Sequence, residues 1–270
     1  MQPFLKWPGG KRWFISKYHT IFPNNYNSYF EPFLGGGSLF FYLEPPKATI
    51  ADINSDLTNT YRMMAQQPKQ LRTLLENHQK NHSETYYYKI RDVIPTNPLD
   101  CAARFIYLNR TCFNGMYREN KNGVFNVPIG TRDCFIEDVD QFDEYARILK
   151  NTSIRTQDFV DTIRDAAIGD FIFADPPYTI AQNQNSFIKY NGKLFSWKDQ
   201  MRLLRALAKA RDRGAIIVST NASYPQLMQK YNEYGFYTQV LGRFSSISGT
   251  SNGRRKQEEL LITSYPVHLQ

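Results

Sequence analysis

The sequence has few cysteines and no long apolar run, and each absence excludes a class of protein. Only three cysteines, Cys101, Cys112 and Cys134, occur among the 270 residues. An odd number without CxxC spacing argues against a disulfide framework and against a zinc site. No stretch reaches the roughly 18 consecutive apolar residues of a membrane span, and the N-terminal residues lack the pattern of a signal peptide. We therefore expect a soluble protein of a reducing cytoplasm, without a metal.

Acidic residues are the minority among the charged ones. The 33 Lys and Arg residues outnumber 25 Asp and Glu, which gives a net charge of +8 and a sequence pI of about 9.3. A hydrophobic fraction of 41% and an aromatic fraction of 15% exclude a disordered chain. The basic balance favours a polyanionic partner. Charge alone does not separate DNA from RNA, from an anionic membrane surface, or from a merely soluble basic protein.

Apolar strand-like runs alternate with helical segments, which predicts an α/β fold with a parallel-rich sheet. The expected strands cover residues 28–31, 48–52, 170–174, 215–220, 236–243 and 258–265. A helix is expected from Ser196, a predicted N-cap with Asp199 three residues on, to about Arg213, where Gly214 ends it.

The character of the chain changes between residues 57 and 154. Helical pieces come first, and residues 114–130 then place turn residues between two polar-aromatic arms, which predicts a β-hairpin. A block of this length is too long for a loop. We expect an inserted domain at 57–154 and a main domain built from residues 1–56 and 155–270.

A glycine turn follows the first expected strand. The glycines at 35–37 open a helix, where backbone can approach a ligand closely. The dinucleotide fingerprint would require glycine where Phe40 stands, so the turn favours S-adenosylmethionine over NAD, and an ordinary tight turn is the alternative. Asp52 ends the next strand, where a carboxylate can bind both ribose hydroxyls. The alternative for Asp52 is a helix cap near Asn54.

The segment Asp175-Pro176-Pro177-Tyr178 follows a buried strand, at the sheet edge where α/β proteins bind ligands. The amino group of adenine is a poor nucleophile because its lone pair is delocalised into the ring. The Asp175 carboxylate and the Pro176 carbonyl can accept its two hydrogens and favour a tetrahedral nitrogen. The two prolines fix the carbonyl, and Tyr178 offers a face for an extruded base. The alternative is a rigid turn with an exposed tyrosine.

With these motifs in this order, the sequence resembles the Dam family of DNA N6-adenine methyltransferases. The matching segments are KWPGGK (6–11), EPFLGGGSLF (31–40), ADINSD (51–56), NRTCFNGMYR (109–118), GVFNVPIG (123–130) and DPPY (175–178). The resemblance implies a Rossmann-like class I methyltransferase with a seven-stranded, mostly parallel sheet and a small inserted target-recognition domain. It also implies S-adenosylmethionine as the methyl donor and S-adenosylhomocysteine as the product.

The resemblance assigns residues to two kinds of contact. The expected cofactor residues are Trp7, Lys11, Phe33, Gly35, Ser38, Asp52, Asp158, Phe159 and Asp175. The expected DNA residues in the matching segments are Lys6, Asn114, Met116, Arg118, Asn126 and Pro128. Among them Arg118 matches a guanine reader, Met116 an apolar wedge, and Pro128 a contact to a thymine methyl, which together point to GATC. Apart from the resemblance, the charge of the loop at Arg254 and Arg255 predicts contacts to phosphate. For Arg254 and Arg255 the alternative is a solvated loop.

We therefore expect a monomeric, site-specific adenine methyltransferase that extrudes its target base from duplex DNA. One alternative is the same chemistry at another sequence, within a restriction-modification system. Another is methylation of a cytosine, an RNA base or a protein amide, which Asp175 and the DNA-reading insert disfavour. The third is a DNA-binding regulator without catalysis, which the intact Asp175–Tyr178 segment disfavours.

Overall fold

The sheet has seven strands and is mostly parallel, as the sequence predicts. The computed structural model describes residues 1–115, 117–118, 120, 124–136, 141–178, 195–244, 256–267 and 269. The strands are β1 (Tyr29–Glu31), β2 (Ala48–Asp52), β3 (Thr152–Thr156), β4 (Phe171–Ala174), β5 (Ile216–Ala222), β6 (Tyr237–Phe244) and β7 (Lys256–Thr263). Their order is β3-β2-β1-β4-β5-β7-β6. β7 is antiparallel to both of its neighbours, and the other pairs are parallel.

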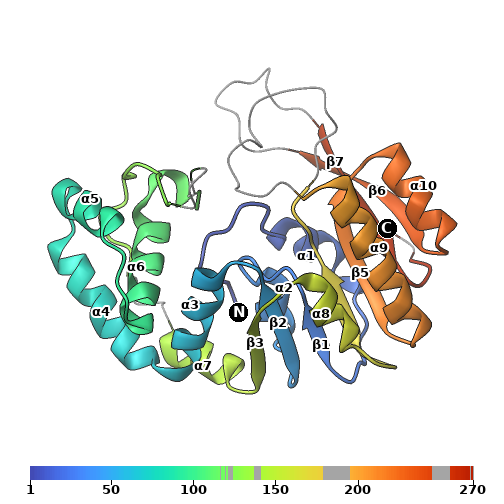
Figure 1. Cartoon of the computed structure of the whole chain (residues 1–270), viewed down its shortest axis with the longest axis horizontal. Helices are drawn as coiled ribbons and strands as arrows, with labels where there is room; N and C mark the ends of the chain where they lie inside the picture. Colours follow the sequence, from blue (N-terminus) through green and yellow to red (C-terminus); the bar gives the residue numbers. More distant parts are fainter. Residues whose placement is uncertain are drawn as a thin grey trace.

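Helices cover both faces of this sheet (Figure 1). They are α1 (Arg12–Tyr18), α2 (Ser38–Leu43), α8 (Phe159–Arg164), α9 (Trp197–Asp212) and α10 (Pro225–Glu233), with a short 3-10 helix η1 (His19–Ile21). Alternate residues of β4 show why helices are needed on both faces of the sheet. Phe171 and Phe173 lie in one apolar core, and Ile172 and Ala174 lie in another. A central strand that is buried on both faces has to be apolar at every position.

The predicted start and end of α9 are confirmed. Ser196 accepts a hydrogen bond from the Asp199 backbone, and the Asp199 carboxylate accepts one from the Ser196 backbone, which completes a capping box. At the other end Gly214 has a φ of 93°. This conformation is easiest for glycine and ends the helix.

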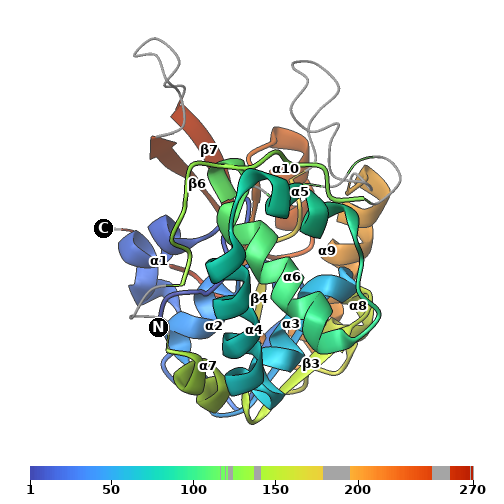
Figure 2. The same ribbon diagram turned by 90° about the vertical axis from the view of Figure 1, so that its left-hand side faces the viewer.

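The insert contains five helices in the described residues. They are α3 (Ser55–Gln66), α4 (Pro68–Asn81), α5 (Glu84–Asp92), α6 (Pro98–Thr111) and α7 (Phe142–Leu149), with a 3-10 turn η2 (Phe113–Gly115). Figure 1 places them beside the β3 edge of the sheet, and Figure 2 views them from that side. The boundary expected between residues 56 and 57 falls inside α3, and the boundary expected between residues 154 and 155 falls inside β3.

The predicted hairpin is an antiparallel chain reversal without regular strands in its described part. Backbone hydrogen bonds join the arms from Phe113 to Pro128 (2.9 Å), from Asn126 to Arg118 (3.3 Å) and from Asn120 to Val124 (2.8 Å). One isolated bridge joins Cys112 and Ile129. Pro128 has no N–H to give to a ladder, and Gly115 has a φ of 63°. The pairing is therefore interrupted, which the turn residues and polar-aromatic arms did not reveal.

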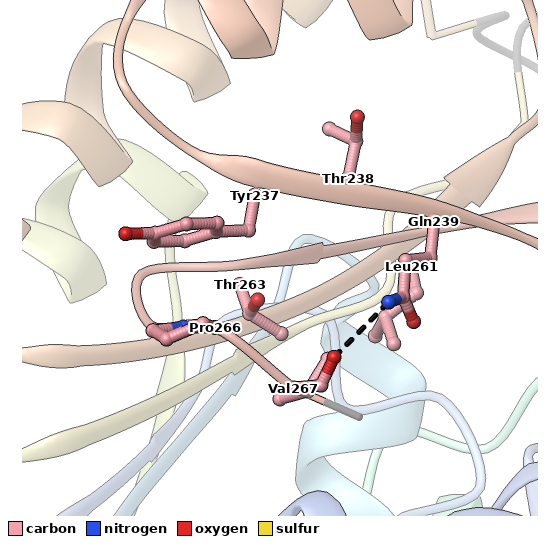
Figure 3. Close-up of a pocket in the computed structure, with 7 residues that line it drawn as sticks. All are labelled: Tyr237, Thr238, Gln239, Leu261, Thr263, Pro266 and Val267. Atoms are coloured by element: carbon pink, nitrogen blue, oxygen red, sulfur yellow. Dashed lines mark hydrogen bonds between the residues drawn. The ribbon is translucent and has the colours of Figure 1, made fainter. Parts of the chain in front are cut away.

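Two further observations concern the described part of the chain. None of its helices is long and apolar enough to span a bilayer, and no cluster of three or more His, Cys, Asp or Glu residues there could hold a metal ion. Figure 3 shows a pocket between β6, β7 and the C-terminal segment, where the Gln239 amide donates to the Val267 carbonyl (3.0 Å). The residues that line this pocket do not include any that the sequence predicts for the site.

Candidate active site

The glycine turn and Asp52 meet at the carboxyl edge of the sheet. Gly35 and Gly37 have positive φ angles of 48° and 65°. The Gly35 N–H donates to Asp52 Oδ2 (3.1 Å), and the Asn54 N–H donates to Asp52 Oδ1 (3.0 Å). The helix cap is Asn54, whose side chain accepts from Leu57, so Asp52 does not serve as the cap of α3. Burial raises the pKa of the Asp52 carboxyl group.

Trp7 lies directly over this turn. A Cβ atom on Gly35 would stand 2.7 Å from Trp7 Cδ1. On its other side the indole stacks on Tyr117 of the insert, with ring centroids 5.3 Å apart. Ser38 begins α2, and a Cβ atom on Gly10 would lie 3.8 Å from its Oγ. The opening motif therefore borders the turn, and bare backbone beside a carboxylate fits a nucleoside with two ribose hydroxyls.

A second carboxylate, Asp158, stands beside an aromatic pair. Phe33 and Phe159, both expected as cofactor residues, stack with ring centroids 5.2 Å apart. Asp158 caps α8 through Val160 N–H (2.9 Å) and binds the Arg202 guanidinium (2.9 Å). That guanidinium also lies 4.9 Å from the Phe159 ring centroid. The sequence did not indicate Arg202, because no local pattern relates a position on α9 to residue 158.

Asp175 directly follows β4, and its carboxylate contacts Thr220 and Lys11. The Thr220 hydroxyl of β5 donates to Asp175 Oδ1 (2.7 Å), and Lys11 Nζ lies 3.0 Å from the same oxygen. Burial raises the pKa of Asp175, and Lys11 opposes that rise. Pro176 is buried, whereas Pro177 is exposed. The carboxylate is thus fixed in place at the start of the predicted catalytic segment.

Lys11 connects the Asp175–Tyr178 segment to the opening motif and to Glu259 of β7. Its side chain is only 3% exposed, and Nζ donates to the Tyr178 hydroxyl (2.7 Å) and to the Gly9 carbonyl (3.3 Å). The Tyr178 hydroxyl in turn donates to Glu259 Oε2 (2.7 Å) on β7. Lys11, predicted as a cofactor residue, therefore contacts the catalytic segment. Sequence reasoning missed Glu259, which lies 81 positions from Tyr178.

Glu31 adds a buried carboxyl group next to these residues. It accepts a hydrogen bond from the Tyr29 hydroxyl (2.8 Å), and burial raises its pKa to about 8, with smaller contributions from the charges of Asp175 and Asp52. At neutral pH Glu31 is therefore mostly protonated. The carboxyl groups of Asp52 and Asp175 lie at the same side of the sheet, where they can accept hydrogen bonds from a ligand.

The predicted DNA residues that the structure describes gather around η2. Asn114 is exposed with a φ of 58°, and Pro128 is also exposed. Lys6 packs on Gly115, where a Cβ atom would lie 2.4 Å from Lys6 Cδ. The main chain of Lys6 exchanges two hydrogen bonds with the Asn109 side chain (2.9 and 2.7 Å).

Arg118 and its neighbours complete this surface. Arg118 Nε donates to Asn126 Oδ1 (3.2 Å), so two predicted DNA residues are in contact. The Phe113 side chain is 52% exposed, although sequence reasoning did not select it. An exposed aromatic ring beside a basic surface can stack on a base. Three predicted DNA residues, Met116, Arg254 and Arg255, lie outside the described residues.

We expect Gly35→Ala to weaken S-adenosylmethionine binding about tenfold, equivalent to about 1.4 kcal/mol. The new Cβ atom would displace Trp7 from the turn. Gly235→Ala is the matched control, because its φ of 78° imposes similar strain and its nearest neighbour is a flexible Arg211 side chain. Both variants should lose about 1–2 kcal/mol of unfolding free energy. Calorimetric titration measures the affinities, and equal affinities in both variants would contradict the expectation.

Known proteins resemble this chain over most of its length. A family model described as D12 class N6 adenine-specific DNA methyltransferase matches residues 7–239. The type II methyltransferase M1.LlaDCHI of Lactococcus lactis subsp. cremoris is 36% identical over 98% of this chain and 96% of that protein. The type II methyltransferase M.MjaIII of Methanocaldococcus jannaschii is 35% identical over 98% of this chain and 99% of that protein.

A DNA adenine methylase of Haemophilus influenzae is 31% identical over 96% of this chain and 92% of its own length. The family match includes the glycine turn, the insert and the Asp175–Tyr178 segment. These findings confirm the resemblance found in the sequence. The chain belongs to the D12 class of N6-adenine-specific DNA methyltransferases.

Proposed function

We propose that this methyltransferase acts as a monomer on adenine within GATC of duplex DNA and turns the target base out of the helix. The observation that carries the proposal is the anchored Asp175 carboxylate, which Thr220 and Lys11 hold at the sheet edge beside Pro176. Preorganised polar groups stabilise a transition state without reorganising during the reaction. Here the fixed group is an acceptor, as an amino group requires.

The cofactor residues line one continuous edge of the sheet. Asp52 would accept hydrogen bonds from the ribose hydroxyls, and Trp7, Gly35 and Ser38 would border the same end of the ligand. Phe33 and Phe159 would pack against its adenine, whose amino group Asp158 would bind. When bound, S-adenosylmethionine supplies an electrophilic methyl group on a positively charged sulfur. The carboxyl oxygens of Asp52 and Asp175 would lie near that positive charge.

The target amino group would be held by two acceptors. The Asp175 carboxylate and the Pro176 carbonyl would each take one hydrogen, and the Tyr178 ring would stack on the base. Because the amino group of a paired adenine is inside the duplex, the base has to leave the stack to reach these groups. Holding both reactants in the right geometry supplies much of the acceleration. Solvent can take the released proton.

The surface around η2 would read the DNA. Arg118, steadied by Asn126, suits bidentate bonding to guanine, and Pro128 suits contact with a thymine methyl group. Lys6 and Asn114 would lie against the same DNA. From the sequence alone, we propose Met116 as an apolar wedge at the base step and Arg254 and Arg255 as phosphate contacts. The net charge of +8 supports a polyanionic partner.

Mapping every modified base after incubation with S-adenosylmethionine and unmethylated DNA tests this proposal. We expect N6-methyladenine confined to GATC. Methyladenine in another motif would keep the chemistry and contradict the roles given to Met116, Arg118 and Pro128. It would favour a restriction-modification partner, as the type II names of two relatives suggest. Sequence-specific binding without any modified base would identify a regulator instead.

A further inference from the structure

Glu259 is a buried carboxylate on an inner strand, at the side of the sheet where the parallel strands have their carboxyl ends and where the candidate active site lies. Its side chain is 4% exposed. It stands on β7, opposite Ala222 of β5 and Leu241 of β6. β7 is antiparallel to β4 and β5 in direction. Its first half therefore lies at the carboxyl ends of those strands, where the Asp175–Tyr178 segment follows β4 (Figure 1). A buried carboxylate costs free energy unless it is hydrogen-bonded or paired with a cation.

The contacts of Glu259 lead directly to the catalytic segment. Its Oε2 accepts a hydrogen bond from the Tyr178 hydroxyl (2.7 Å) and lies 3.3 Å from Lys11 Nζ. Tyr178 also accepts a hydrogen bond from Lys11 (2.7 Å) through the same hydroxyl. One hydroxyl therefore acts as donor and acceptor at once. Two directed bonds at the far end of a side chain fix both the position and the tilt of its ring.

Lys11 extends the same network to the acceptor of the amino group. Its Nζ lies 3.0 Å from Asp175 Oδ1 and 4.8 Å from the centroid of the Tyr178 ring. The stacking face and the acceptor are thus connected to one carboxylate, through the Tyr178 hydroxyl and through Lys11. Stability alone does not explain a buried ion pair at this position, because an apolar side chain of the same volume can often replace such a pair without loss of stability.

We propose that Glu259 is a positioning residue for methyl transfer. It holds the Tyr178 hydroxyl and Lys11, so that the stacking face and the Asp175 carboxylate keep a fixed separation before the target base arrives. This inference rests on the proposed roles of Asp175 and Tyr178. Loss of Glu259 should therefore lower kcat and leave the cofactor and DNA dissociation constants within about twofold, because the ligand contacts themselves remain.

The test compares Glu259→Gln and Glu259→Leu with the same changes at Glu258. Glu258 is the neighbouring residue on β7 and is exposed. Because small displacements of reacting groups are costly, we expect kcat to fall about fivefold with glutamine and about 20-fold with leucine. Both Glu258 variants should keep the wild-type kcat. Glutamine is isosteric, so Glu259→Gln decides the question even if Glu259→Leu does not fold.

A double-mutant cycle separates positioning from a general structural role. Tyr178→Phe keeps the ring and removes the hydroxyl. If Glu259 acts through that hydroxyl, Glu259→Gln should cost less than twofold in kcat in the Tyr178→Phe background. Full additivity, or equal kcat for the glutamine variants at 258 and 259, would overturn the inference.

A second readout follows the target base directly. With 2-aminopurine at the target position, the fluorescence gained on binding should be lower in Glu259→Gln than in Glu258→Gln, and equal signals would count against the inference. The wild-type protein separates the two proposals. If it does not methylate DNA, the proposed function fails; if it does and the Glu259 variants behave like the controls, only the role of Glu259 fails.

Discussion

Replacing Asp175 with alanine is expected to lower the methyl-transfer rate at least about 10³-fold, because it removes the carboxylate that we propose as the acceptor for the amino group. DNA binding should remain largely intact, since Asp175 follows β4, whereas the residues proposed to read the DNA lie around η2. Lys11 would keep Tyr178 and Glu259 as partners. The protein should therefore fold, and the loss should lie in kcat.

Single-turnover methylation and fluorescence anisotropy measure the two quantities. Asp170→Ala is the matched control, because Asp170 is a buried aspartate at the opposite end of β4 that accepts a hydrogen bond from Ala167 (2.8 Å). That variant should lose stability and keep its rate per folded molecule. A rate for Asp175→Ala within tenfold of the wild type would show that this carboxylate is not the acceptor.

The parts of the fold that could be predicted are those where the signal is local. β2 was predicted with its observed ends, because a buried parallel strand needs a continuous apolar run and here ends on Asp52. The capping box at Ser196 depends only on residues three positions apart. In both cases neighbouring residues decide the structure, so the sequence alone is sufficient.

The contacts within the site could be predicted only in part. Asp175 and Tyr178 stand in one motif. Their partners are distant in the sequence, because Lys11 lies 167 positions from Tyr178 and Glu259 lies 81 positions from Tyr178. Their meeting depends on β7 entering the sheet between β5 and β6, a topological fact without a local pattern. The predicted hairpin shows that a local pattern can also predict too much regular structure. Its turn residues between polar-aromatic arms predicted a β-hairpin, but Pro128 and the positive φ of Gly115 interrupt the ladder.

Replacing Arg118 with alanine should relax discrimination at one base of the target by about 1–3 kcal/mol, which is roughly a 5- to 150-fold loss. The Asn126 side chain accepts from Arg118 Nε (3.2 Å), which fixes the plane of the guanidinium. A planar, fixed guanidinium selects guanine because both bonds form only with that base. Methylation of substrates changed at each target position in turn measures the discrimination.

Arg72→Ala is the matched control for Arg118→Ala, since it removes the same charge from the insert. Arg72 lies on α4, where it pairs with Glu76 (2.9 Å). A loss of charge alone would weaken binding to all sequences alike and reduce its salt dependence in both variants. A guanine reader would instead lose preference at one position only. If Arg118→Ala and Arg72→Ala gave the same uniform loss, Arg118 would be a phosphate contact, and the surface around η2 would position the DNA without reading it.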